Sequence, residues 1–253
     1  MAEEQRKFDY PTEVIDLPSE GKLYSKKSPL SSGKIDVKYM TAKEEDILTS
    51  QNLIKKGVVI TKLLDSLIVT PGVKSDDLVL GDKNAVMVAA RILAYGPEYT
   101  CEVSNPTTGE TFTNTFNLTD CPFKKLPKGI EDNDFEIELP ISKKKINFKL
   151  LTGSDENSIN NDLKNVSKLG SPISPELTTR LRHIITAVDG EDSIQVISSF
   201  VDSMLSRDSL YLRQEIKRIS PDIDMEQEVD IQGDTVKVVI PMTASFFWPD
   251  VEG

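Results

Sequence analysis

The chain has 253 residues, of which 38% are hydrophobic and 28% are charged, a balance typical of a folded protein rather than a disordered one. Its 41 acidic residues outnumber its 30 lysines and arginines, which gives a formal net charge of -11. This charge disfavours tight binding to nucleic-acid backbones, which requires clustered basic side chains, so no nucleic-acid partner is expected. It favours solubility and, at most, a partner with a basic surface.

Residues 1–33 are predicted to be an extended N-terminal segment that leads into a strand. Residues 18–21 have the composition of a turn, and residues 28–33 have that of a loop. The range 34–40 alternates apolar with charged residues, which is the period of a half-buried strand.

Two helices are predicted directly after this strand. Thr41 and Glu44 have the spacing of a capping box, which starts a helix that should end near Leu48. The second helix, over 58–68, carries an apolar stripe that consists of Val59, Leu63 and Leu67.

A third helix is predicted over 83–95. Asp82 has the residue type and position of its N-cap. Its inner face is small and apolar and consists of Val86, Ala89, Ala90 and Leu93. The alanines predict the close approach of another backbone.

The apolar pattern then changes to period two and predicts two β-hairpins. The first joins residues 99–103 to 111–118 through a turn at 105–109 that contains Pro and Gly. The second turns at residues 143–145, and its facing apolar residues are Phe135, Ile137, Leu139, Ile146, Phe148 and Leu150.

The next part of the chain is predicted to be helical, at 154–169, 175–188, 193–205 and 209–219. Pro175 is predicted at the first helical position of the second helix, where no N–H is needed. Asp208 is predicted to be the N-cap of the fourth. The third helix has one apolar face, made of Ile194, Ile197, Val201 and Leu205.

The C-terminus is predicted to return to strand, at 228–231, 235–242 and 244–248. The last strand holds Phe246, Phe247 and Trp248, followed by Pro249, in a chain with only 6% aromatic residues. In a strand, Phe246 and Trp248 would point to one face and Phe247 to the other. These rings could dock into the core or form an exposed anchor, and we take all four residues as a candidate partner-binding site.

The sequence predicts no catalytic, metal or cofactor site. His183 is the single histidine and lies among apolar residues, so it is expected to be a structural residue held by a hydrogen bond. The cluster of Glu44, Glu45 and Asp46 is an alternative site for a carboxylate-based hydrolase. These three lie in the first turn of a predicted helix, where the helix dipole stabilises carboxylates, and we therefore expect no enzyme.

The sequence favours a protein of the cytoplasm. It opens with polar and acidic residues rather than a secretory signal, and its longest apolar stretch, 57–69, is too short to span a bilayer. In that compartment Cys101 and Cys121 are expected to be free, half-buried thiols rather than a disulfide.

A series of short segments stands out when they are taken in chain order. They are YMTAKEEDILT at 39–49, LIKKG at 53–57, GDKNA at 81–85, RILAYG at 91–96 and FFWP at 246–249. In this order they resemble the baseplate hub assembly chaperones, also called hub subunits, of T-even-type contractile-tailed bacteriophages. The resemblance is strongest over 35–120. Some relatives have a Cys-x-x-Cys-like pattern where this chain has the 105–109 turn, so no metal role is carried over.

The resemblance implies a non-enzymatic protein that promotes assembly of the central hub of the tail baseplate. It would act as a chaperone in the cytoplasm of infected bacteria and bind hub or tape-measure proteins, with a permanent structural subunit of the hub as the alternative. We expect an α+β fold of three parts: an extended segment at 1–33, a mixed helix and hairpin region at 34–152, and a helical region with closing strands at 153–253. The oligomeric state is not predicted.

Overall fold

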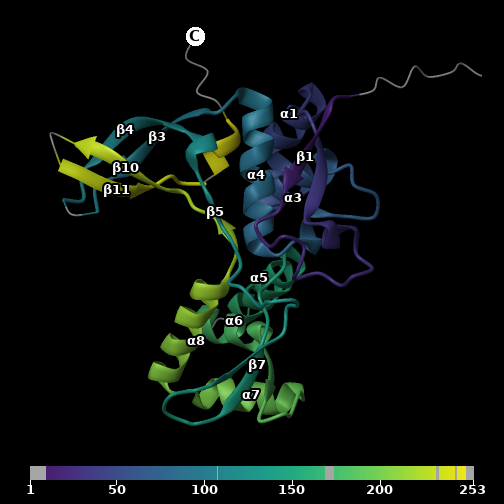
Figure 1. The fold of residues 1–253 in the computed structure, drawn as a ribbon, viewed down its shortest axis with the longest axis vertical. Coiled ribbons are helices and arrows are strands. Elements are labelled where there is room, and N and C mark those ends of the chain that lie inside the picture. Colours follow the sequence, from purple (N-terminus) through teal and green to yellow (C-terminus); the bar gives the residue numbers. More distant parts are fainter. Residues whose placement is uncertain (1–9, 107, 169–173, 232–233, 243, 249–253) are drawn as a thin grey trace, which may run out of the picture.

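The computed structural model describes residues 10–106, 108–168, 174–231, 234–242 and 244–248. Figure 1 shows two lobes, one above the other. We define the first lobe as the described residues of 10–121 and 222–248, and the second as those of 126–219. Each lobe is built on one cluster of buried apolar side chains, and the cluster of the second lobe also takes in Leu23 and Val79 from the first. Helices and small antiparallel sheets are mixed throughout, which confirms the predicted α+β class.

The first lobe begins with a short hairpin that covers a group of helices. In chain order its elements are β1 (Thr12–Asp16), the 3-10 helix η1 (Pro29–Ser32), β2 (Lys34–Lys38), α1 (Ala42–Thr49), α2 (Gln51–Lys56), α3 (Val59–Leu67), η2 (Ser75–Asp77) and α4 (Leu80–Tyr95). The predicted strand at 34–40 and the predicted capping box at Thr41 are confirmed. The stripe on α3 is also confirmed, since all three of its residues are buried.

Two further hairpins lie side by side and extend from this lobe (Figure 1). They are formed by β3 (Glu98–Ser104) with β4 (Thr111–Asn117), and by β10 (Glu226–Ile231) with β11 (Asp234–Val239). Exposed and buried positions alternate along these strands, and the apolar residues at the inner positions, such as Tyr99, Val103, Phe116 and Val238, belong to the core of the first lobe. The first hairpin predicted from the sequence is confirmed.

The second lobe packs four helices around one antiparallel sheet of order β6-β7-β8. Its elements are β6 (Phe135–Glu138), β7 (Lys145–Phe148), α5 (Gly153–Lys168), α6 (Glu176–Ile184), β8 (Ile185–Val188), α7 (Ile194–Ser203) and α8 (Ser206–Ile219). The predicted hairpin is confirmed, with Phe135 opposite Phe148 and Ile137 opposite Ile146.

The chain returns to the first lobe after α8. β5 (Phe123–Lys124) on the way out pairs with β9 (Asp222–Ile223) on the way back. The returning segment, which ends in the 3-10 helix η4 (Ala244–Phe247), contributes six buried apolar residues to the first core: Ile223, Met225, Val238, Ile240, Phe246 and Phe247. The division of the chain at residues 33 and 152 stays a prediction, because clusters of buried residues do not by themselves define domains.

The start of α4 lies in close contact with the returning chain. A Cβ on Gly81 would come within 1.8 Å of the Pro221 carbonyl oxygen, so only glycine fits there. Beside it, the Asn84 side chain donates a hydrogen bond of 3.0 Å to Asp222. The Leu80 amide donates to the carbonyl oxygen of Leu151 in the second lobe at 3.1 Å. This end of α4 therefore joins the two lobes.

Both aspartates predicted as N-caps lie inside their helices, so those two predictions were wrong. α4 begins at Leu80 and α8 at Ser206, which places Asp82 and Asp208 in the first turn. The helices start earlier because tertiary contacts hold their first turns, as the bond from Leu80 to the second lobe shows. Both carboxylates are fully buried and bind other segments of the chain.

The helix predicted over 175–188 ends early, at Ile184, and the next four residues form β8. β8 pairs with β7, and this pairing buries Ile185 and Val188 between the sheet and the helices. Sheet pairing with a strand about forty residues away thus overrides the local helical pattern. Pro175 is the N-cap rather than the first helical residue.

Other differences are smaller. Residues 28–33, predicted as a loop, contain the 3-10 helix η1, and α2 was not predicted. Of the apolar face predicted over 193–205, Ile197 and Val201 are buried, whereas Ile194 at the start of α7 and Leu205, the N-cap of α8, are exposed. On α4, Val86 and Ala90 are buried as predicted, and the other two residues of that face are half-buried.

Candidate interaction site at the C-terminal aromatics

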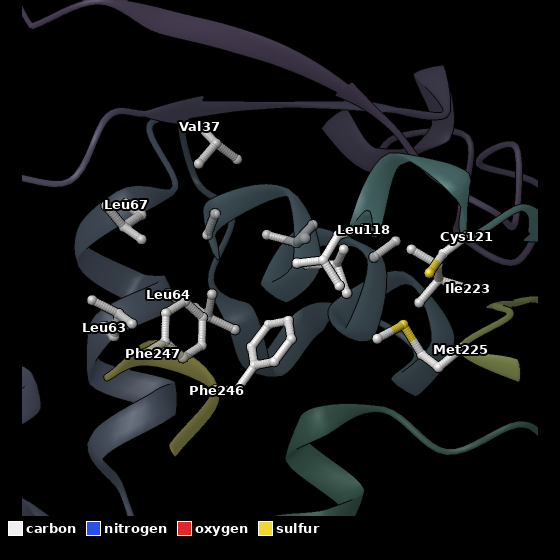
Figure 2. Packing of buried hydrophobic residues seen from close by; sticks show 14 of the residues in the cluster. Val37, Leu63, Leu64, Leu67, Leu118, Cys121, Ile223, Met225, Phe246 and Phe247 are labelled. Carbon is white, nitrogen blue, oxygen red and sulfur yellow. The ribbon is translucent and has the colours of Figure 1, made fainter. Parts of the chain in front are cut away.

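The C-terminal aromatic residues form a turn of 3-10 helix, so the predicted strand at 244–248 was wrong. In this helix Phe246 and Phe247 both face the core instead of opposite faces, and both are fully buried. Figure 2 shows Phe247 beside Leu63 and Leu64 of α3. The Phe246 ring packs edge-on against Tyr99 of β3, with 5.0 Å between the ring centres.

Arg91 on α4 fixes the position of this segment. Its Nε donates to the Phe246 carbonyl oxygen at 3.0 Å, and its two terminal nitrogens donate to the carbonyl oxygens of Gly96 at 3.3 Å and Glu98 at 3.4 Å. Its guanidinium also lies over the rings of Tyr95 and Tyr99. Burial lowers the pKa of Arg91 from its usual value, and the carbonyl oxygens and aromatic faces compensate for its lost hydration.

The four residues predicted to bind a partner therefore have different positions. Phe246 and Phe247 are core residues that stabilise the first lobe. Trp248 packs against the same core but is only partly buried, which leaves part of its ring accessible. Pro249 lies outside the described residues. Of the three described aromatic residues, only Trp248 is not fully buried.

The carboxylate cluster of α1 does not converge on one point. Glu44 is fully buried, whereas Glu45 and Asp46 are exposed. The Glu44 carboxylate accepts hydrogen bonds from Lys38 at 2.8 Å and Ser66 at 2.7 Å, as well as from the amide and hydroxyl of Thr41. Burial by itself would raise the pKa of Glu44, but these donors outweigh it and lower the pKa to about 2. Glu44 is therefore a structural anion that links β2, α1 and α3.

The remaining candidate residues are also held in structural contacts. The His183 Nε2 is 2.9 Å from a carboxylate oxygen of Asp162, which confirms the predicted hydrogen bond. Cys101 and Cys121 are both free, as predicted, and burial raises the pKa of the Cys101 thiol to about 11. Among the described residues, no group of three or more His, Cys, Asp or Glu side chains could hold a metal ion.

A cavity of about 340 Å³ lies between the lobes, beside Gly81 and Pro221. Its basic side chains have acidic partners in the same lobe: Lys149 contacts Asp155 at 2.7 Å, and Arg180 contacts Glu156 at 2.5 Å. The other side chains that line this cavity are mostly apolar, and both of its basic side chains are already paired.

Comparison with known protein families identifies the chain. The family model described as T4 bacteriophage base plate protein matches residues 10–248, which is almost the whole sequence. The chain belongs to the T4 bacteriophage base plate protein family. The match covers both lobes of this base plate protein and its C-terminal aromatics. No curated protein and no solved structure matches the chain. None of the described helices is both long enough and apolar enough to cross a membrane.

The family agrees in general terms with the resemblance seen in the sequence. Both point to a contractile-tailed phage and to its baseplate, and hence to an infected bacterium or a virion as the setting. A base plate protein works through contacts with other base plate proteins, which favours a structural or assembly role over catalysis. The buried cluster around Arg91 and Phe246 was missed in the sequence, because a lone arginine on an amphipathic helix carries no local signal of its partner.

Proposed function

We propose that this base plate protein is a non-enzymatic assembly chaperone that binds components of the central hub, or the tape-measure protein, in the cytoplasm of the infected host. The observation that carries the proposal is the family match over residues 10–248. The segments at 39–49, 81–96 and 246–249, which resemble hub assembly chaperones, support the narrower role. Their side chains at Glu44, Asp82 and Phe246 are buried and hold the first lobe together.

The same family match supports an alternative, a permanent structural subunit of the hub. Whether purified virions contain this protein distinguishes an assembly chaperone from a permanent subunit. A chaperone that acts before the virion is complete should be absent from extensively washed particles by quantitative mass spectrometry, while known tail proteins are detected. The presence of this protein at a fixed ratio to those tail proteins would overturn the chaperone proposal in favour of the subunit.

Trp248 is our candidate for the partner contact, and Phe247 provides a matched control because it is aromatic, adjacent and fully buried. Phe247→Ala should lower the free energy of unfolding by about 3–5 kcal/mol, since it leaves a cavity in the core. Trp248→Ala should cost less stability and weaken binding to hub proteins, because exposed aromatic rings often dominate interfaces. Thermal unfolding and a pull-down from infected cells measure these effects. Full retention of hub proteins by Trp248→Ala would place the partner site elsewhere.

A further inference from the structure

The second lobe has an open strand edge beside a groove. β6 is the outer strand of the sheet β6-β7-β8, and no other described strand pairs with its free side. The Leu139 amide donates to Lys144 and so points toward β7. Peptide groups alternate in direction along an antiparallel strand, so those of Ile137 also face β7, while those of Glu136 and Glu138 face outward. Two unpaired peptide units are therefore available on this edge.

A groove of about 380 Å³ runs along this edge. It is lined by four consecutive residues of the chain, 134–137, together with the loop 127–132 and the end of α8. Within β6, the side chains of Phe135, Glu136 and Ile137 alternate between the two faces of the sheet, so a groove lined by all three reaches the outer edge of the strand as well as the face that holds Phe148 of β7. Its apolar part is formed by Pro127, Ile130, Phe135, Ile137, Phe148 and Ile219.

The charged residues around the groove are mostly acidic. Glu131, Asp132, Asp134, Glu136 and Glu215 line it, against Lys128 and Arg218. Arg218 is already paired with Glu215 at 2.8 Å. Four carboxylates and one lysine are left, so the groove has a net negative charge. This charge selects against a second copy of a chain whose own net charge is -11.

We propose that the outer edge of β6 binds an extended, basic segment of another protein, which adds as a fourth strand to the sheet. Its backbone would pair with the peptide groups of Glu136 and Glu138. Its alternate side chains would then fall on the two faces of the sheet, apolar ones beside Phe135 and Ile137 and basic ones beside Glu136 and Glu138. This inference deepens the proposed assembly function by naming the chemistry of a partner segment.

Short synthetic peptides test the proposal with the purified full-length protein. One end-capped peptide alternates lysine with valine, and its matched control alternates glutamate with valine. The lysine peptide should bind in a fluorescence anisotropy titration, with an affinity that falls as salt is added, and the glutamate peptide should not. Amide hydrogen exchange at Glu136 and Glu138 should slow in the complex. Equal binding of both peptides, or unchanged exchange at these amides, would overturn the proposal.

Two substitutions of Glu136 separate what its backbone N–H and its charge each contribute to the affinity for the lysine peptide. Glu136→Pro removes an outward-facing N–H together with the carboxylate and should weaken the lysine peptide about tenfold, while β6 itself should persist because proline is tolerated on a free strand edge. Glu136→Gln should weaken it less and reduce its salt dependence. The matched control is Glu228→Pro on β10 in the other lobe, an exposed glutamate at a position that also faces away from its partner strand. This control should bind like the unsubstituted protein. Equal affinities for Glu136→Pro and Glu228→Pro would contradict the proposal.

A second probe is used if Glu136→Pro lowers the thermal midpoint. The lysine peptide methylated on alternate backbone nitrogens keeps its charge but cannot donate to the carbonyl oxygens of β6. It should bind the unsubstituted protein at least about tenfold more weakly, and equal affinity would again overturn strand addition. Concentration-dependent self-association that competes with the peptide would identify a second copy as the occupant. Because every measurement uses purified protein and peptides, its result does not depend on whether the chain acts as a hub chaperone.

Discussion

Individual buried polar side chains tie distant segments of this base plate protein together. Asp82 accepts hydrogen bonds from the amide and hydroxyl of Ser19 and from the Tyr24 hydroxyl, at 2.5–2.9 Å. Asp208 accepts from the amides of Ile141 and Ser142, at 2.8 and 3.0 Å. A buried carboxylate is costly unless it is fully hydrogen-bonded, so each of these residues stabilises one arrangement of the chain over others.

Glu44 offers a direct test of whether a buried, ionised carboxylate stabilises the fold. Its pKa is 4.5 in an ordinary setting and about 2 in the folded protein, so the folded chain binds this proton less tightly than the unfolded chain. The stabilisation is therefore complete above pH 4.5 and is lost as the pH falls toward 2. Glu44→Gln should lower the free energy of unfolding at pH 7 by about 2–3 kcal/mol.

Urea unfolding at a series of pH values measures this effect. The difference in stability between the unsubstituted protein and Glu44→Gln should shrink as the pH falls through that window. The control is Asp46→Asn, an exposed carboxylate on the same helix, which should stay within about 0.5 kcal/mol of the unsubstituted protein. A pH-independent difference for Glu44→Gln would mean that its ionised form is not what stabilises the fold.

Among the elements, α4 connects the N-terminal segment, the returning chain and the second lobe. Its N-terminal turn contacts Ser19, Pro221 and the second lobe, and Arg91 near its other end holds the C-terminal 3-10 helix. A helix with buried residues on most of its circumference needs small residues where other backbones approach. Gly81 meets that need at the contact with Pro221.

The change in stability caused by Gly81→Ala tests how closely α4 packs against the returning chain. Alanine in place of glycine within a helix ordinarily stabilises a protein by about 0.5–1 kcal/mol. Gly81→Ala should instead destabilise this one by about 1–3 kcal/mol, because the new Cβ would clash with a backbone carbonyl that has no alternative rotamer. Thermal unfolding decides between the two signs, and a raised midpoint would show that α4 and the returning chain are less tightly packed than this contact implies.

At the scale of the whole molecule, the first lobe is made from both ends of the described chain. The second lobe is inserted between them, and the crossing segments are joined by the β5–β9 pair. The six apolar residues that the returning segment buries are worth about 1.5–3 kcal/mol each. Their sum is comparable with the total stability of a typical domain.

Removing the returning segment tests whether the first lobe needs it to fold. A chain that ends at Ser220 should lose the folded first lobe while it retains helical signal from α5 to α8. Circular dichroism and limited proteolysis would then show a protected fragment within 126–219 and rapid cleavage of residues before 121. Protection of the first lobe in the truncated chain would show that its helices and hairpins fold without the returning segment.

The sequence by itself determined the features that depend on neighbouring residues. The capping box of Thr41 and Glu44, the stripe on α3 and the two hairpins were all predicted, although the turn of the second hairpin lies at 140–142 rather than at 143–145. Each depends on a period, a turn or a cap that spans only a few residues, so local physical chemistry is sufficient to specify it. The acidic residues 131, 132, 134 and 136 are also visible in the sequence, but the groove that they line is not.

Only the tertiary structure decided the features that join residues far apart in the chain. Arg91 holds Phe246 across 155 residues, and this contact is part of what turns a predicted strand into a buried 3-10 helix. Asp82 binds Ser19 across 63 residues instead of capping its own helix. β8 is a strand because β7 offers unpaired peptide groups beside it. In each case a distant partner supplies more free energy than the local preference, and the sequence around the residue does not record where that partner lies.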